Sequence, residues 1–350
     1  PNENPGVGTP SVRIKNNLAA IRLVKKLDAE KRVPTAEEKD ILAKYVGWGG
    51  LPDVFEEKHT AYAELKELLT EEEYDSARSS VLTAFYTDPQ IIRGMYEVLE
   101  RIGFDGGKVL EPSCGIGTFI GCMPESMRAN SEVHGVELDT ITGKIAKYLY
   151  PQSNIQICGY EKTDYKDNTF DLAIGNVPFG DFGVIDKRYD AKKWLIHDYF
   201  FGKTMDKVRP GGIIAFITST GTMDKRDCTF RDYLASRGEL LGAVRLPDTA
   251  FKTAAGTSVN SDIIFLKKRE KVLLTSNMLS ASVEEKLSDL RVPEVEKMWS
   301  IASFSYYTRS YINEYYAINN EMLCGDAKKI SGRFGNEVVY KCDSEEEFKQ

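Results

Sequence analysis

The chain has 350 residues, of which 42% are hydrophobic and 28% charged, and its formal net charge is −7. This composition excludes a chain that is disordered throughout, and the length accommodates two or three units of about 150 residues. No apolar run approaches the roughly 20 residues that a membrane helix requires, and the polar start carries no signal peptide, so we expect a cytoplasmic protein without a membrane partner.

The cysteine, histidine and lysine content indicates which metal, disulfide and DNA-binding sites the chain can form. Six scattered cysteines form no Cys-x-x-Cys pair and only three histidines exist, so we expect neither a metal site nor a disulfide framework. The net charge argues against a uniformly basic surface but leaves DNA open, because binding depends on local phosphate contacts. The candidate patches are Lys187-Arg188 with Lys192-Lys193, Lys225-Arg226, and Lys267-Lys268-Arg269 with Lys271. Each patch is alternatively a solvated face.

Residues 11 to 80 have a helical pattern. The apolar stripe at helical spacing comprises Leu18, Ile21, Val24 and Leu27. Thr35 with Glu38 and Thr70 with Glu73 match capping boxes, which predict the starts of two further helices. In the turn Gly47-Trp-Gly-Gly between them, we expect Trp48 to anchor the helical layer by burial, with a stacking platform for DNA as the alternative.

The segment Ala84-Phe-Tyr-Thr-Asp-Pro-Gln leads into a predicted helix over residues 91–102. Thr87 with Gln90 matches a further capping box, which predicts that Thr87 caps this helix.

The stretch from residue 109 to 179 organises the chain. An apolar strand breaks into Glu111-Pro-Ser-Cys-Gly-Ile-Gly, and missing side chains in such a turn let a ligand approach the backbone. A second strand ends on Glu137, 20 residues after Gly117. That separation is expected between a glycine turn and the acid that accepts hydrogen bonds from a ribose diol, so the spacing predicts a nucleoside ligand. Glycines that only permit a tight turn are the alternative.

Two further strands follow in this stretch. Residues 154–158 form the third predicted strand, which Glu161 and Asp164 follow. The apolar run 170–174 precedes Asn176-Val-Pro-Phe, so these polar and aromatic residues lie at the carboxyl end of a parallel strand, where open α/β sheets bind ligands.

The remaining pattern predicts the sheet topology. Helices over 191–208 and 225–237 alternate with strands over 213–218, 240–246 and 263–266. This alternation predicts an α/β fold with a doubly wound, mostly parallel sheet whose last strands form an antiparallel hairpin. Towards the C-terminus we expect helices near 282–289 and 311–322.

Two features look like catalytic groups but lack suitable neighbours. Cys114 lies in the glycine turn with no histidine near it in sequence, so we interpret it as a small filler rather than a nucleophile. His197 and Asp198 are adjacent on a predicted helix, where adjacent side chains point apart, so we interpret them as structural.

Glu111-Pro-x-x-Gly-x-Gly, Glu137 and Asn176-Val-Pro-Phe, in that order, resemble the S-adenosylmethionine-dependent amino methyltransferases, specifically the gamma-class DNA adenine-N6 enzymes. The closer resemblance is to the methylase domain of mobile-element proteins that join a methylase to an SNF2-type helicase. Further matching segments are Tyr45-Val-Gly-Trp-Gly-Gly-Leu and Gly211-Gly-Ile-Ile-Ala-Phe-Ile-Thr-Ser. The resemblance covers roughly residues 15 to 325 and implies a Rossmann-like class I methyltransferase fold behind an α-helical N-terminal extension.

The resemblance implies a set of residues that contact S-adenosyl-L-methionine. They are Tyr86, Thr87, Glu111, Pro112, Gly115, Gly117, Glu137, Leu138 and Glu161. Tyr86 and Thr87 would contact the methionine part, and the acid after the third strand would read the cofactor's adenine. Glu161 is nearer the strand end than Asp164, although either is alternatively an ordinary loop carboxylate.

The implied chemistry is carried by Asn176, Val177, Pro178 and Phe179. An adenine amino group is a poor nucleophile, and acceptors from the Asn176 side chain and the Val177 carbonyl would localise its lone pair and aim it at the methyl donor. The broader class has proline where this chain has Val177; a carbonyl survives that change, and Pro178 keeps Val177 extended. Phe179 would stack on the flipped base. Phe251 is a second candidate base contact, with packing onto the core as the alternative.

From these patterns we predict a helical extension over residues 1–80, a methyltransferase core over 81–270, and a partly helical segment over 271–350. The chain opens on proline, so we expect a fragment of a longer chain. The resemblance implies a bacterial protein whose longer chain includes a helicase region, and we expect it to be a monomer. The predicted substrate is double-stranded DNA. The alternatives are methylation of protein glutamine or of an rRNA amino group, whose enzymes share this signature, and a non-catalytic DNA-binding or anti-restriction module.

Overall fold

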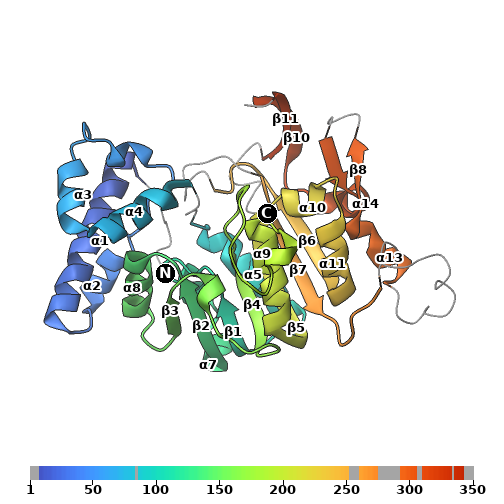
Figure 1. Cartoon of the computed structure of the whole chain (residues 1–350), viewed down its shortest axis with the longest axis horizontal. Helices are drawn as coiled ribbons and strands as arrows, with labels where there is room; N and C mark the ends of the chain where they lie inside the picture. Colours follow the sequence, from blue (N-terminus) through green and yellow to red (C-terminus); the bar gives the residue numbers. More distant parts are fainter. Residues whose placement is uncertain are drawn as a thin grey trace. The chain divides into compact units, whose positions relative to one another are not determined.

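The computed structural model describes residues 8–82, 86–251, 260–274, 292–305, 310–332 and 335–342 (Figure 1). Within these ranges, no helix is both long enough and apolar enough to cross a membrane. Seven strands form the main sheet in the order β3-β2-β1-β4-β5-β7-β6, and two small antiparallel pairs, β8-β9 and β10-β11, lie later in the chain.

The helices are α1 (Pro10–Glu30), α2 (Ala36–Leu42), α3 (Tyr62–Leu68), α4 (Glu71–Ser79), α5 (Pro89–Arg101), α6 (Thr118–Cys122), α7 (Glu125–Ala129), α8 (Thr140–Leu149), α9 (Ile196–Lys207), α10 (Gly221–Asp224), α11 (Thr229–Arg237), α13 (Glu294–Lys297) and α14 (Glu314–Ile318). The strands are β1 (Gly107–Glu111), β2 (Ser131–Glu137), β3 (Asn154–Ile157), β4 (Phe170–Asn176), β5 (Val208–Ser219), β6 (Gly238–Leu246), β7 (Ser261–Lys268), β8 (Ala302–Ser305), β9 (Ser310–Asn313), β10 (Asp326–Gly332) and β11 (Gly335–Lys341).

The sheet confirms the predicted fold class. β1 pairs in parallel with β2, and β2 pairs in parallel with β3. β7 runs antiparallel to both β5 and β6 and lies between them in the sheet. A mostly parallel, doubly wound sheet whose last strand is antiparallel is the Rossmann-like arrangement of class I methyltransferases, and helices precede it here as predicted.

The chain divides into two compact units, which we describe separately. The first comprises residues 1–164, 174–178 and 251–258, and the second comprises 165–173, 179–250 and 259–350. Each unit is assembled from several separate segments of the chain. The predicted division into residues 1–80, 81–270 and 271–350 therefore stays a prediction.

In the first unit, the N-terminal helices α1 to α4 gather beside α8 (Figure 1). The stripe predicted on α1 is buried, with Ile21, Val24 and Leu27 fully removed from solvent. Thr35 and Thr70 form the two predicted capping boxes, each confirmed by reciprocal bonds with the glutamate at the third helical position. Trp48 is 1% exposed and packs edge-on against Phe55 at 5.6 Å between ring centroids, which confirms the anchoring interpretation.

In the second unit, the sheet buries an arginine. Arg245 on β6 is 2% exposed and donates to both oxygens of the fully buried Asp262 on β7, at 2.9 and 3.0 Å. Its guanidinium also pairs with Asp224 at 2.7 Å and lies 4.5 Å from the centroid of the Tyr316 ring. A buried arginine is tolerated because its donors meet carboxylates and its planar face meets a ring.

The C-terminal segment is fastened to this unit by side-chain bonds to main-chain oxygens. The buried Asn313 amide donates to the carbonyls of Met223 and Trp299 at 2.8 and 2.7 Å, and Arg231 donates to the Ser300 carbonyl at 2.8 Å. The helix predicted over 311–322 is wrong at its start, because residues up to Asn313 form β9. The α-helix covers Glu314–Ile318, and a short 3-10 helix, Asn320–Met322, follows it. The helix predicted near 282–289 lies outside the described residues.

Candidate active site

The glycine turn after β1 has the backbone that its sequence predicts. Gly115 and Gly117 have φ values of 54° and 84°, in the left-handed region that glycine adopts without steric cost. A Cβ on Gly117 would lie 2.6 Å from the Tyr150 ring, so this glycine also permits a close approach. Gly117 caps α6, and the main chain therefore turns directly from the strand into a helix at the carboxyl end of β1.

Glu137 at the end of β2 faces this turn. One carboxylate oxygen accepts from the Gly115 N–H and the other from the Asp139 N–H, both at 2.8 Å. Burial raises the pKa of Glu137 to about 7, despite these main-chain donors. The structure therefore brings together the two features, glycine turn and acid, whose separation of 20 residues predicted a nucleoside site.

Glu111 is a buried acid at the end of β1, with 2% of its surface exposed. Within the described part of the chain, its Oε2 has no hydrogen-bond partner. Burial, reinforced by the nearby Glu137, holds the pKa of Glu111 well above its usual range. Gly175 on β4 leaves space beside this side chain, since a Cβ there would lie 3.6 Å from Glu111 Cγ. A buried acid without a partner suits a ligand that brings a cation or a donor.

Tyr86 and Thr87 lie beside the glycine turn. A Cβ on Gly47 would lie 2.9 Å from Tyr86 Cε2, and a Cβ on Gly115 would lie 3.6 Å from Tyr86 Cε1. The Tyr86 ring is thus held between the two glycines. The capping box predicted for Thr87 with Gln90 is wrong: Asp88 caps α5 by accepting from the Gln90 N–H at 2.8 Å, because Pro89 occupies the first helical position.

Thr87 instead holds Asn176. The Thr87 hydroxyl, on a residue only 4% exposed, accepts a hydrogen bond from the Asn176 amide nitrogen at 3.2 Å. The Asn176 main-chain carbonyl accepts from the Ser113 hydroxyl at 2.8 Å. Because its nitrogen is bound to Thr87, the amide presents its oxygen as the end that can accept from a substrate amino group. Asn176 as a whole is half-buried at the carboxyl end of β4, whereas its side-chain oxygen is buried in the protein.

The other residues of the predicted catalytic segment have different environments. The Val177 side chain is 1% exposed, whereas Pro178 and Phe179 are half-buried. Phe179 belongs to the second compact unit and Val177 to the first. Phe251 is 1% exposed, and this burial favours the packing alternative for it. The role of each residue in methyl transfer stays a prediction.

The remaining candidates for cofactor contact differ in exposure. Leu138 is 70% exposed directly after Glu137, so its apolar surface is available to a ligand. Glu161 is half-buried in a short 3-10 helix, Tyr160–Lys162, and its carboxyl group lies over Gly159, where a Cβ would collide with it. Asp164 is exposed. This difference in burial favours Glu161 over Asp164 as the ligand-binding acid.

Three further expectations concern side chains that resemble catalytic or metal-binding groups, and the structure differs from one of them. His197 and Asp198 do not point apart: His197 Nε2 and Asp198 Oδ2 lie 3.0 and 2.9 Å from Lys225 Nζ. Burial and this lysine lower the pKa of His197 to about 3. Cys114 is 4% exposed and burial raises its thiol pKa, which supports the filler interpretation. Among the described residues, no group of three or more His, Cys, Asp or Glu is arranged to hold a metal ion.

Many cations of the predicted DNA patches are used inside the protein. Arg188 binds Asp167 through two hydrogen bonds of 2.9 and 2.7 Å, and Arg269 pairs with Glu296. Lys268 donates to the Asn168 side chain and to the Val208 carbonyl. The sequence does not reveal this intramolecular pairing. Fewer lysines and arginines can therefore contact DNA phosphates than the basic patches predicted.

Sequence reasoning missed how the helical layer supports the site. Asp139, the N-cap residue of α8, accepts from the Thr142 N–H and from the Ser76 hydroxyl of α4, both at 2.8 Å. Asn17 of α1 accepts from the Val46 N–H at 2.9 Å and donates to the Gly47 carbonyl, and these bonds fix the turn that touches Tyr86. The buried polar residue Asn17 within the apolar stripe was the signal that could have indicated this contact.

Comparisons with known proteins give distant relatives. No protein-family model matches the chain. Defense against restriction protein B of Escherichia phage P1 is 30% identical over 288 residues, which are 78% of this chain and 11% of the phage protein. Modification methylase CviBIII of Paramecium bursaria Chlorella virus NC1A is 25% identical over 138 residues, which are 38% of this chain and 36% of that protein. The chain therefore spans well under two thirds of these relatives.

Among solved structures, the type I restriction-modification system methyltransferase subunit from Streptococcus thermophilus is 16% identical, with a TM-score of 0.48. The match covers 72% of this chain and 66% of that subunit. The fold itself is identified by the strand order, with β7 antiparallel between β5 and β6. The chain has the fold of the class I S-adenosylmethionine-dependent methyltransferases.

Proposed function

We propose that the chain is the catalytic part of a DNA methyltransferase that transfers a methyl group from S-adenosyl-L-methionine to the N6 amino group of adenine. The single observation that carries this proposal is the position of Asn176: its amide is held by Thr87 at the carboxyl end of β4, in the same compact unit as Glu111 and Glu137. An amide oxygen at that edge of the sheet suits an acceptor for a planar amino group.

The residues present fit the proposed cofactor. Glu137 has the position to accept from the ribose hydroxyls, and the exposed Leu138 beside it offers an apolar surface for the adenine ring. The buried Glu111, which has an oxygen without a partner in the described part of the chain, suits the positively charged methionine end. When bound, the cofactor supplies an electrophilic methyl group on a sulfonium.

The protein's part in the reaction is to orient the acceptor nitrogen. The Asn176 amide oxygen and the Val177 carbonyl would each accept one hydrogen of the adenine amino group, which localises the nitrogen lone pair. Phe179 would stack on the base after it leaves the duplex, because a stacked base cannot reach a buried methyl donor. Positioning of this kind accelerates transfer without a covalent intermediate.

The test is methyl transfer from radiolabelled cofactor to duplex DNA, followed by digestion and quantification of N6-methyladenine. Asn176→Ala should abolish transfer while cofactor binding persists, and Asn154→Ala, at an exposed position on β3, should behave like the wild type. Equal transfer by the Asn176→Ala chain would refute the assignment. Release factor and ribosomal RNA in parallel reactions distinguish DNA from protein glutamine or rRNA as the acceptor.

A second candidate function is a non-catalytic anti-restriction module. It is favoured by the similarity of the chain to Defense against restriction protein B of phage P1. A chain that binds the cofactor but transfers no methyl group to DNA from any source would support this alternative.

The setting of the activity is also a proposal. Because the chain matches only 11% of the phage relative, we propose that it acts as one part of a longer protein of a mobile genetic element, in which a helicase region accompanies the methylase in the bacterial cytoplasm. We further propose that the chain is a monomer on its DNA. Sedimentation of the chain with and without a duplex tests this.

A further inference from the structure

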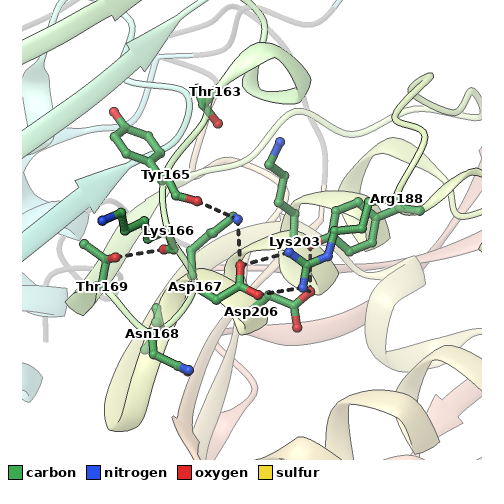
Figure 2. A network of polar contacts seen from close by, with 12 residues as sticks. Thr163, Tyr165, Lys166, Asp167, Asn168, Thr169, Arg188, Lys203 and Asp206 are labelled. Atoms are coloured by element: carbon green, nitrogen blue, oxygen red, sulfur yellow. Dashed lines mark hydrogen bonds and ion pairs between the residues drawn. The ribbon is translucent and has the colours of Figure 1, made fainter.

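The loop between β4 and α9 is held in place by a network of ion pairs (Figure 2). Arg188 binds Asp167 through both of its terminal nitrogens and also donates to Asp206 at 2.8 Å. Lys207 donates to Asp167 at 2.8 Å and to the Tyr165 carbonyl. Hydrogen bonds from Arg188 lower the pKa of Asp167 to about 2, so this carboxyl group is charged at neutral pH.

A second set of bonds fixes the middle of the same loop. Asp186 accepts from the Tyr199 hydroxyl at 2.7 Å and from Lys203 at 3.1 Å, and its own N–H donates to Asp190 at 2.8 Å. The Tyr189 hydroxyl donates to Asp206 at 2.7 Å. The loop is therefore preorganised, which lowers the entropy cost of binding a partner.

This anchored loop nevertheless exposes apolar and basic side chains. Ile185 is 86% exposed and Phe182 is 48% exposed. Lys187, Lys192 and Lys193 are exposed, and within the described part of the chain none of them forms an ion pair. Lys192 does lie 5.6 Å from the centroid of the Tyr233 ring. Exposed apolar side chains among exposed lysines are typical of a surface that meets a polyanion with apolar faces.

The loop also encloses a pocket of about 280 Å³. Its walls include Phe182, Tyr189, Trp194 and Tyr199, with Asp190 and Lys193 among the polar lining residues. Tyr189 and Trp194 are stacked, with centroids 5.9 Å apart and planes at 27°, and Phe230 and Tyr233 support Trp194 edge-on. The volume is just below the lower end of the range for small-molecule sites, about 300 Å³, so it suits one heterocycle rather than a whole cofactor.

We propose that residues 181–195 are a preformed DNA-contact surface, in which the aromatic pocket takes a nucleobase other than the one that is methylated, while Lys187 and Lys193 contact phosphates. This inference rests on the proposed action on DNA. It goes beyond that function by assigning to residues 181–195, which follow the Asn176-Val-Pro-Phe segment in the sequence, a second nucleotide in addition to the target base. Aromatic faces accept any base, so the pocket would add affinity without adding sequence preference.

Binding of fluorescein-labelled DNA to the full chain, measured by anisotropy over a range of salt concentrations, tests the surface. Replacing both Lys187 and Lys193 by alanine should weaken binding and reduce the slope of log K against log salt by about 0.9 for each lysine. The matched control replaces Lys15 and Lys26, two exposed lysines of α1, and should leave affinity and slope unchanged.

Two further variants test the pocket. Phe182→Ala should weaken binding roughly tenfold, the range expected for one stacked base, whereas Val33→Ala, at a position 75% exposed, should not. Trp48 and Trp299 are 1% and 3% exposed, so quenching of tryptophan emission by oligothymidylate should come from the half-buried Trp194 and be lost in Trp194→Phe, which keeps an aromatic wall.

The outcomes separate this inference from the proposed function. If no DNA is methylated but the loop variants still weaken DNA binding as described, adenine methylation fails and the contact surface stands. If DNA is methylated while the loop variants bind it as tightly as the wild type, the contact surface is refuted. A wild-type chain that binds no DNA at about 50 mM salt, where phosphate contacts are strong, refutes the surface as well.

Discussion

The contact between Gly47 and Tyr86 allows a sharp test of how the N-terminal layer supports the site. Gly47→Ala places a Cβ 2.9 Å from Tyr86 Cε2, and the ring cannot retreat freely because Gly115 lies against its other side. The φ value of 62° adds strain of its own. A left-handed alanine costs about 1–2 kcal/mol and overpacking a further 1–3 kcal/mol, so we expect a loss of about 2–5 kcal/mol in the free energy of unfolding.

Gly103→Ala is the matched control. Gly103 has a φ value of 87° and no atom within 4 Å of its would-be Cβ, so only the strain of about 1–2 kcal/mol applies there. Urea unfolding of both variants isolates the steric part. Calorimetric titration with S-adenosyl-L-methionine should show at least tenfold weaker binding for Gly47→Ala and no change for Gly103→Ala.

A double-mutant cycle completes this test. Combining Gly47→Ala with Tyr86→Ala removes the ring that the new methyl group meets, so the two stability losses should fall short of additivity by about the overpacking cost. If Gly47→Ala binds the cofactor like the wild type, or if both glycine variants lose equal stability, the ring is not clamped between the two turns and the reasoning fails.

Three other predictions concern ionisation and hydrogen bonding. Because the pKa of Glu137 is about 7 and ribose hydroxyls would favour its charged form, cofactor affinity should fall about tenfold from pH 8 to pH 6, and calorimetry of Glu137→Gln should show no such fall. His197 stays neutral in the folded protein down to about pH 3 but takes up a proton below pH 6.5 when unfolded, so the free energy of unfolding should drop by about 2 kcal/mol between pH 6.5 and 5, a drop that urea titrations of His197→Gln should lack. Thr87→Val removes the acceptor that holds Asn176, so kcat for DNA methylation should fall about tenfold, and an unchanged kcat would show that the bond does not position the amide.

The parts of the fold that sequence predicted are those set by local patterns. The Thr35 and Thr70 capping boxes and the turn at Gly115 and Gly117 depend on residues a few positions apart, and the structure has them as predicted. The spacing between Gly117 and Glu137 brought the acid to the turn because a βαβ unit returns the chain to the same sheet edge.

The parts that sequence did not predict depend on distant partners. His197 and Asp198 converge because Lys225, 27 residues beyond Asp198, lies against both side chains. Residues before Asn313 form a strand because β8 offers a pairing edge, which outweighs their helical pattern. The sequence predicted that Arg188 could contact a DNA phosphate, whereas in the structure its guanidinium donates to Asp167 and Asp206.

The fastening of the C-terminal segment limits how the protein can be shortened. The sequence pattern predicts that the core ends near residue 270. A chain that stops there would lose the Ser300 carbonyl that accepts from Arg231 and the Tyr316 ring that covers the Arg245 guanidinium. Such a trimmed version should precipitate on expression, because aromatic surface that the segment covers would be exposed to water. Engineers who seek a minimal catalytic fragment should therefore retain the chain at least through Ile318, the end of α14.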